Sequence, residues 1–128
     1  HTADIKFRVY GKNLNEIFEN CASAVSEYLG RGDKIKSIKT KKIKLKGEDR
    51  ESLLYGFLDE LIYLLDAENF VVAKAKVKIK DNELEAEIYG DKASNYKDLD
   101  HIKAATYAEM YTKQKKNKSW EAQVVLDV

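Results

Sequence analysis

The feature that most constrains the fold is a pair of alternating segments separated by two polar residues. In residues 74–80 apolar side chains alternate with lysines, and in residues 83–88 they alternate with glutamates, with Asp81 and Asn82 between. A period of two is typical of a strand with one buried face, and Asp-Asn suits a two-residue hairpin turn. The pattern predicts an antiparallel hairpin with lysine–glutamate pairs on its exposed face. The expected pairs are Lys80 with Glu83, Lys78 with Glu85 and Lys76 with Glu87.

Two other segments carry apolar residues at helical spacing. Residues 14–29 follow Asn13, a residue type that suits a helix N-cap, and are followed by Gly30, which we expect to end the helix. Residues 53–65 follow Asp49, an acid that favours a helix N-terminus. The second segment has the broader apolar stripe, so we expect it to be the central core helix.

The rest of the chain adds strands and loops. Further strands are expected at residues 4–10, 35–45 (one strand or two), 102–111 and 120–128, with a loop at 91–101 and a turn at 113–118. This order predicts an α+β fold, formed as a single domain over residues 1–128. Two helices would pack on one side of a mainly antiparallel sheet or a partly closed barrel.

Composition excludes several classes of protein. Lys and Arg number 23 against 22 Asp and Glu, so the net charge of +1 gives no overall attraction to nucleic acid. The apolar runs are far shorter than a membrane span requires, and the single cysteine, Cys21, lies on the apolar face of the first helix. We therefore expect a soluble, cytoplasmic protein. Because the chain starts at His1 inside a predicted strand, we also expect a short N-terminal segment to precede it.

Motifs for nucleotide and acyl chemistry are absent from the sequence. It contains none of the glycine patterns of phosphate-binding loops, dinucleotide folds or nucleophile elbows. Two histidines and one cysteine cannot supply a zinc cage of nitrogen and sulfur ligands. Any metal would be bound by oxygen atoms, which makes calcium or magnesium the candidates.

Two acidic residues stand at the ends of the chain. Asp4 opens the first predicted strand and Asp127 is the penultimate residue of the last. If these strands are neighbours, Asp4, Asp127 and the terminal carboxylate of Val128 bring up to three negative groups together, and a divalent cation would relieve their repulsion. Solvated strand ends are also often acidic, so spacing alone leaves both interpretations open.

Five segments, in order and over essentially the whole chain, resemble the archease family. They are His1-Thr2-Ala3-Asp4-Ile5, Ser52-Leu53-Leu54-Tyr55, Phe57-Leu58-Asp59-Glu60-Leu61, Lys103-Ala104-Ala105-Thr106-Tyr107 and Gln123-Val124-Val125-Leu126-Asp127-Val128. The most specific feature is the combination of HTADI with an ending of aspartate plus an aliphatic residue.

The resemblance implies an accessory protein rather than an enzyme. Its partner would be an RtcB-type tRNA-splicing RNA ligase, and its role would be to promote GMP attachment to the ligase and repeated turnover in tRNA exon joining. The resemblance also implies a divalent metal of the calcium type, held by Asp4, Asp127 and Val128. Lys103 matches a family lysine and is a candidate for contact with the partner, as is His1.

The sequence departs from the family pattern near that lysine. Ala108 follows Thr106-Tyr107 where family members often have histidine, and His101-Ile102 stands where they often have an acid and valine. The role of the missing histidine is therefore not carried over to this chain.

Two other functions remain open from the residues alone. Lysines at 34–46 and 113–118, with Tyr111 and Trp120 nearby, would suit direct RNA binding. A metal-dependent hydrolase could use the acidic cluster to activate water, although only Lys103 or His1 could then carry protons.

Overall fold

The computed structural model describes residues 4–128, which form two long helices and seven strands. In chain order the elements are β1 (Asp4–Gly11), α1 (Leu14–Gly30), β2 (Lys39–Lys46), α2 (Arg50–Glu68), β3 (Phe70–Lys80), β4 (Glu83–Lys92), the short 3₁₀ helix η1 (Ala93–Asn95), β5 (Ala104–Ala105), β6 (Tyr111–Gln114) and β7 (Trp120–Asp127).

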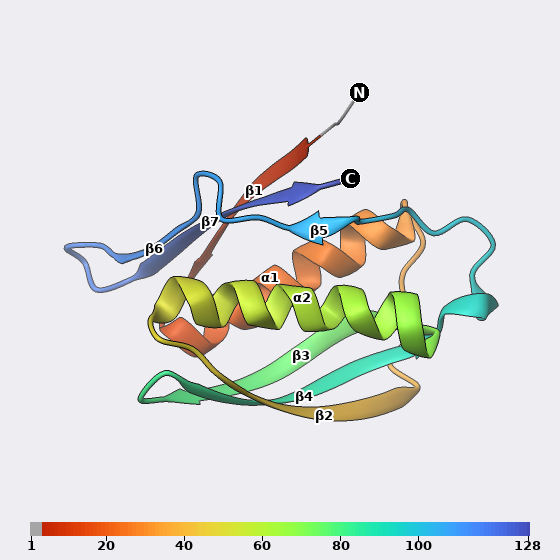
Figure 1. The fold of residues 1–128 in the computed structure, drawn as a ribbon, viewed down its shortest axis with the longest axis horizontal. Helices are drawn as coiled ribbons and strands as arrows, with labels where there is room; N and C mark the ends of the chain where they lie inside the picture. Colours follow the sequence, from red (N-terminus) through yellow and green to blue (C-terminus); the bar gives the residue numbers. More distant parts are fainter. Residues whose placement is uncertain (1–3) are drawn as a thin grey trace.

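The strands form two antiparallel sheets. In the first, here called sheet A, β7 lies between β1 and β5 and also pairs with β6, and in the second, sheet B, β4 lies between β2 and β3. Both helices contact strands of both sheets, and Figure 1 shows them between the two. Each sheet therefore has the helices on one of its faces. The predicted α+β fold with antiparallel strands and two helices is confirmed, and the sheets do not close into a barrel.

The predicted hairpin is formed by β3 and β4. Lys80, Lys78 and Lys76 lie opposite Glu83, Glu85 and Glu87, as expected from the two-residue turn. Asp81 and Asn82 both have positive φ, 52° and 60°, the backbone that this turn requires. β2 lies on the other side of β4, and its Lys44 and Lys46 form exposed ion pairs of 3.6 and 3.3 Å with Glu85 and Glu83.

Side-chain caps fix the helix starts. The Asn13 carboxamide oxygen accepts a hydrogen bond from the Glu16 amide at 2.9 Å, as predicted. Asp49 forms a capping box with Ser52, and these hydrogen bonds hold the pKa of Asp49 below its ordinary value. α1 includes Gly30, and the left-handed residue that follows the helix is Arg31, so the helix ends one residue later than predicted.

The predicted single strand over 102–111 is wrong. Only Ala104 and Ala105 pair with β7 before the chain leaves the sheet at residues 106–110 and rejoins β7, in the same direction, as β6. The Thr106 hydroxyl donates to the Val125 carbonyl at 2.8 Å and accepts from the Ala108 amide at 3.2 Å, which starts the turn. Alternation could not reveal this break, because it depends on a hydrogen bond to a residue nineteen positions away.

Smaller differences concern the flanks of sheet B. The basic segment at 35–45 forms one strand, which begins only at Lys39, while Ile35 is buried in the preceding loop. β4 continues to Lys92, where it pairs with Phe70, so the loop expected at 91–101 begins later.

The core lies around α2, as predicted. Phe57, Leu58 and Leu61 of α2 are at most 1% exposed, and the Phe57 ring packs against Phe18 of α1 with centroids 5.6 Å apart. Cys21 is buried beside them, and burial raises the pKa of its thiol to about 12, in keeping with a small hydrophobic residue. Within residues 4–128, neither helix combines the length and hydropathy needed to cross a bilayer.

Asp91 connects two loops through a buried hydrogen-bond network. One carboxylate oxygen accepts from the Tyr96 hydroxyl at 2.8 Å, and the other accepts from the Lys92 amide at 2.8 Å and the Asn95 side chain at 3.2 Å. The Tyr96 hydroxyl in turn accepts from the Lys36 amide at 2.8 Å. The hydrogen bond from Tyr96, followed by those from Lys92 and Asn95, keeps the pKa of Asp91 below its ordinary value.

Replacing Tyr96 by phenylalanine is expected to lower the free energy of unfolding by roughly 1–2 kcal/mol at neutral pH, because the hydroxyl makes two hydrogen bonds. A lowered carboxyl pKa adds stability that is complete above the ordinary pKa and is lost as the pH falls through the native one. The penalty should therefore shrink below about pH 4. Urea unfolding at several pH values would measure it, with Tyr63→Phe on exposed α2 surface as the control. An equal penalty at pH 7 and pH 3 would contradict this account.

Candidate metal and partner site

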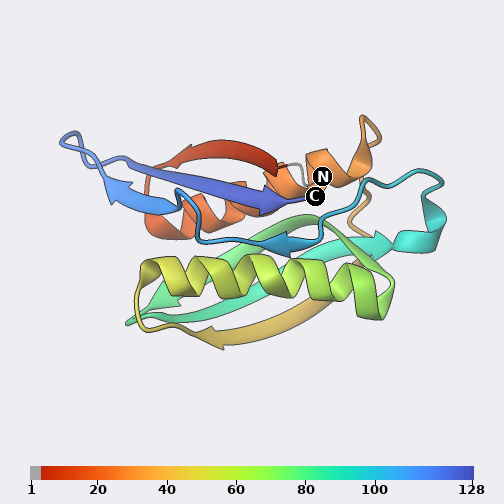
Figure 2. The same ribbon diagram turned by 45° about the horizontal axis from the view of Figure 1, so that its top comes forward.

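The pairing of β1 with β7 brings the two ends of the chain together. Asp4 and Asp127 are directly opposite in the antiparallel register, so their side chains lie on the same face of sheet A. Figures 1 and 2 show the end of β7 beside the start of β1. The expectation that these strands are neighbours is confirmed.

Strand pairing fixes the backbone of Asp127 on both edges of β7. β1 contributes Asp4, and β5 contributes Ala104 on the opposite edge, while the Lys103 amide donates to the Asp127 carbonyl at 2.8 Å. Within residues 4–128, Oδ1 of Asp127 is a buried side-chain oxygen without a hydrogen-bond partner. A buried carboxylate oxygen is costly unless a donor or a cation satisfies it. Among residues 4–128, this oxygen therefore lacks the donor or cation that would satisfy it.

The available ligands fit a hard cation. No three His, Cys, Asp or Glu side chains gather as a metal-binding group in the part of the chain that the structure describes. The expected set contains two such side chains, Asp4 and Asp127, and Val128, half-buried against the core, supplies further oxygen atoms. Carboxylate and main-chain oxygens are the ligands that calcium prefers. His1, the other candidate at this end, lies outside the described residues.

Lys103 lies next to this pair. It immediately precedes β5, its side chain is exposed, and its amide is fixed to the Asp127 carbonyl. A cationic side chain at this position can contact a partner protein or a phosphate group beside the acidic pair. His101, two residues earlier, is also exposed.

A polar network on the same face of sheet A was not predicted from the sequence. Arg8 donates to the Gln123 side chain at 2.9 Å, and Gln123 donates to the Glu109 carbonyl at 2.7 Å. Lys6 pairs with the Glu109 carboxylate at 3.2 Å. Gln123 is only 5% exposed, so this network holds the loop between β5 and β6 against the sheet.

A second buried group lies further along β7. Glu121 accepts a hydrogen bond from the Tyr111 hydroxyl and pairs with Lys115 at 3.3 Å and Lys113 at 3.8 Å. The bond from Tyr111, followed by the lysines, lowers the pKa of Glu121, and the same bond raises the pKa of Tyr111. Both faces of β7 are largely buried, so its sequence gave no alternation that could have marked these polar residues as special.

Tyr107 lies in the turn between β5 and β6. Its ring stacks on Tyr55 of α2, with centroids 4.3 Å apart and planes within 8° of parallel, yet Tyr107 remains 55% exposed. This contact packs the turn between β5 and β6 against α2. Ala108, at the position where a family histidine was expected, is exposed beside it.

Comparison with known proteins places the chain among relatives over its full length. The family model described as "Archease protein family (MTH1598/TM1083)" matches residues 1–128. "Protein archease" of Pyrococcus furiosus is 39% identical over 134 residues, covering 100% of this chain and 94% of that protein. "Protein archease-like" of Drosophila melanogaster is 33% identical over 135 residues, covering 100% and 86%.

A solved structure agrees with the fold. The solution structure of Methanobacterium thermoautotrophicum protein 1598 matches with a TM-score of 0.77 and 30% identity, covering 100% of this chain and 94% of that one. The family model and the curated relatives both span the two ends that carry Asp4 and Asp127. This chain therefore belongs to the archease family.

Proposed function

We propose that this chain is an accessory protein that activates an RtcB-type tRNA-splicing RNA ligase. Its role would be to promote GMP attachment to the ligase and repeated turnover, while the ligase carries out the chemistry. Membership of the archease family supports this proposal. The chain would contact tRNA through the ligase.

The observation that carries the proposal is the pairing of Asp4 with Asp127, whose Oδ1 is buried and has no hydrogen-bond partner among the residues that the structure describes. Two carboxylates on directly opposite residues of paired strands repel each other, and a cation between them relieves that repulsion. We propose that Asp4, Asp127 and Val128 hold a divalent metal ion, calcium in the first instance. The bound ion would fix the shape and charge of this end of sheet A.

The metal-bound end would act by binding the ligase, with Lys103 beside it. Such binding accelerates guanylylation if it favours the conformation of the ligase in which that step occurs. Each tenfold acceleration requires only about 1.4 kcal/mol of preferential binding. No chemical step by this chain is needed.

The test is the rate of GMP attachment to the cognate ligase, measured with GTP and no RNA. We expect the wild-type chain to accelerate GMP attachment. Asp127→Asn and Asp4→Asn should each reduce that acceleration at least tenfold, because each removes a metal ligand. Lys103→Ala should weaken the effect through partner contact. Asp66→Asn, an exposed substitution at the far end of α2, is the matched control and should behave as wild type.

Two results would contradict the proposal. Equal acceleration by Asp127→Asn and wild type would remove the acidic pair from the function. Metal-dependent phosphodiester hydrolysis by the chain alone, abolished in Asp4→Asn, would instead favour the hydrolase that the sequence left open.

A further inference from the structure

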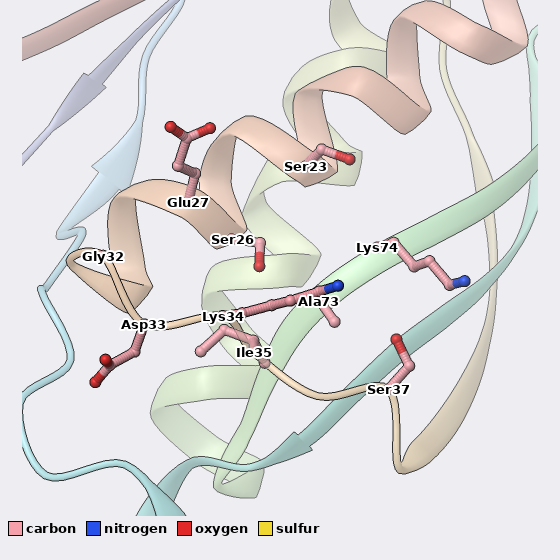
Figure 3. A pocket seen from close by; sticks show the side chains of 10 residues that line it. All are labelled: Ser23, Ser26, Glu27, Gly32, Asp33, Lys34, Ile35, Ser37, Ala73 and Lys74. Atoms are coloured by element: carbon pink, nitrogen blue, oxygen red, sulfur yellow. The ribbon is translucent and has the colours of Figure 1, made fainter.

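A cavity of about 450 Å³ lies away from the acidic pair, between α1, the loop that follows it and β3 (Figure 3). Its lining includes the hydroxyl residues Ser26 and Ser37, the lysines Lys34 and Lys74, and the acids Glu27 and Asp33. Hydroxyl and ammonium groups all donate hydrogen bonds, and ammonium cannot accept them. The cavity is therefore suited to a ligand rich in acceptor oxygens.

The two acids of the cavity lining point away from Lys34. Glu27 and Asp33 contribute to the rim of the cavity, but in Figure 3 their carboxylates point away from the side chain of Lys34. Lys34 instead extends toward Ala73, on the side where Ser26 and Ser37 lie. The ammonium group of Lys34 therefore lies apart from these carboxylates.

A β-bulge in β3 opens the backbone at the same place. The register between β3 and β4 shifts between Val72 and Lys74, which leaves Ala73 without a partner on β4. Bulges are common beside binding sites, because the extra residue redirects the chain and frees its peptide groups from the ladder. Ala73 lines the cavity, and Lys74 is the next residue.

Lys74 also begins a basic surface on sheet B, which we call the lysine face. It comprises Lys42, Lys44, Lys46, Lys74, Lys76, Lys78 and Lys80, with Glu83, Glu85 and Glu87 of β4 between the two lysine strands. Seven lysines against three glutamates leave an excess of four positive charges, although the whole chain has a net charge of only +1. The positive charge is therefore concentrated here.

Much of this excess is not taken up by ion pairs. Among residues 4–128, only Lys44 and Lys46 of the lysine face have an acidic side chain within 4 Å. Glu87 instead accepts a hydrogen bond from the Tyr89 hydroxyl at 2.8 Å. The lysines of β3 recur at every second residue, about 6.6–6.8 Å apart along the strand.

We propose that this cavity and the lysine face bind the phosphate backbone of RNA. One phosphate would lie in the cavity beside Lys34, and neighbouring phosphates would lie along β3, beginning at Lys74, whose ammonium lies over the Tyr89 ring. Such contacts recognise charge and backbone, so binding would depend little on sequence and strongly on salt. The choice of RNA as the polyanion rests on the proposed function, in which the partner ligase joins RNA.

The experiment measures binding of fluorescently labelled single-stranded RNA to the isolated chain over a series of salt concentrations, without ligase. For wild type we expect affinity to fall linearly with salt on logarithmic axes. The double variant Lys34→Ala/Lys74→Ala should bind more weakly. Its slope of log affinity against log salt concentration should be shallower by about 1.4, since it loses two phosphate contacts and each contact on a single strand contributes about 0.7. The control Lys97→Ala/Lys116→Ala removes the same charge from exposed positions elsewhere and should keep the wild-type slope.

Three results would overturn the proposal: no salt-dependent binding by wild type, an equal loss of slope in the control pair, or competition by polyglutamate as effective as that by unlabelled RNA. The last would assign the surface to acidic proteins. GMP attachment to the ligase uses no RNA and should be unchanged by Lys34→Ala/Lys74→Ala. The RNA proposal and the proposed function can therefore fail separately.

Discussion

Replacing Gly90 with alanine is expected to lower the free energy of unfolding by about 3 kcal/mol or more, at the upper end of overpacking effects. A Cβ atom at Gly90 would lie 2.1 Å from the Val71 carbonyl oxygen and 2.8 Å from Cζ of Phe70. Both distances are below van der Waals contact, and the nearer atom belongs to the backbone. The strand pair must shift to admit a single methyl group.

The surroundings of Gly90 leave little room for such a shift. β4 is the central strand of sheet B, and Gly90 lies opposite Lys39 of β2 and Val72 of β3. Its carbonyl accepts from the Ile38 amide at 2.8 Å, and Phe70 is only 1% exposed beneath the helices. Any movement would therefore break hydrogen bonds or open the core.

Urea unfolding of Gly90→Ala beside Gly56→Ala would test this. Gly56 lies inside α2, where the nearest atom to a new Cβ is Cδ1 of Leu45 at 3.9 Å, an ordinary contact. Alanine there should stabilise the helix by up to about 1 kcal/mol. The same substitution is thus expected to change the free energy of unfolding in opposite directions at the two glycines. A Gly90→Ala variant as stable as wild type would show that β3 and β4 do not pack as described.

The elements that sequence predicted best are those fixed by local interactions. The β3–β4 hairpin follows from alternation and from Asp81-Asn82, and the helix starts follow from Asn13 and Asp49, whose side chains bond to amides three residues away. Each of these signals lies within a few residues of the structure that it specifies. They would be visible in any fragment that contained them.

Features that depend on contacts between residues far apart in the sequence were either missed or wrongly predicted. The turn after Ala105 requires Thr106 to bond to Val125, and the buried position of Gln123 requires Arg8 and the Glu109 carbonyl. Neither set of hydrogen bonds produces a periodic pattern in the sequence. The cavity beside Ala73 was equally hidden, because it combines a loop, a helix and a bulge.

The pairing of Asp4 with Asp127 could be predicted from the sequence only in part. Sequence suggested that Asp4 and Asp127 meet if the terminal strands are neighbours, and the strand pairing confirms that condition. The buried oxygen of Asp127, which has no hydrogen-bond partner within residues 4–128, could not be foreseen, because its burial depends on how the strands on both sides of β7 pack. That oxygen gives the pairing of Asp4 with Asp127 an energetic consequence that can be measured.

Calcium is expected to reverse the order of stability of wild type and Asp127→Asn. Without metal, the Asp127 carboxylate has a buried oxygen with no partner among residues 4–128 and lies opposite Asp4, so a neutral amide of the same shape should leave the protein as stable or more stable. With calcium at a hundredfold its dissociation constant, wild type should gain about 2.7 kcal/mol, since only the folded state assembles the ligands. The variant lacks one of those ligands and should gain far less.

Thermal or urea unfolding in EDTA and in calcium, at constant ionic strength, would reveal this reversal without any ligase. Asp66→Asn removes the same charge from an exposed position on α2 and should gain as much from calcium as wild type does. If calcium stabilises Asp127→Asn and wild type equally, the ion binds elsewhere or nonspecifically. If it stabilises neither, the acidic pair does not hold calcium, and the repulsion between Asp4 and Asp127 must be relieved by a cationic group of the partner protein.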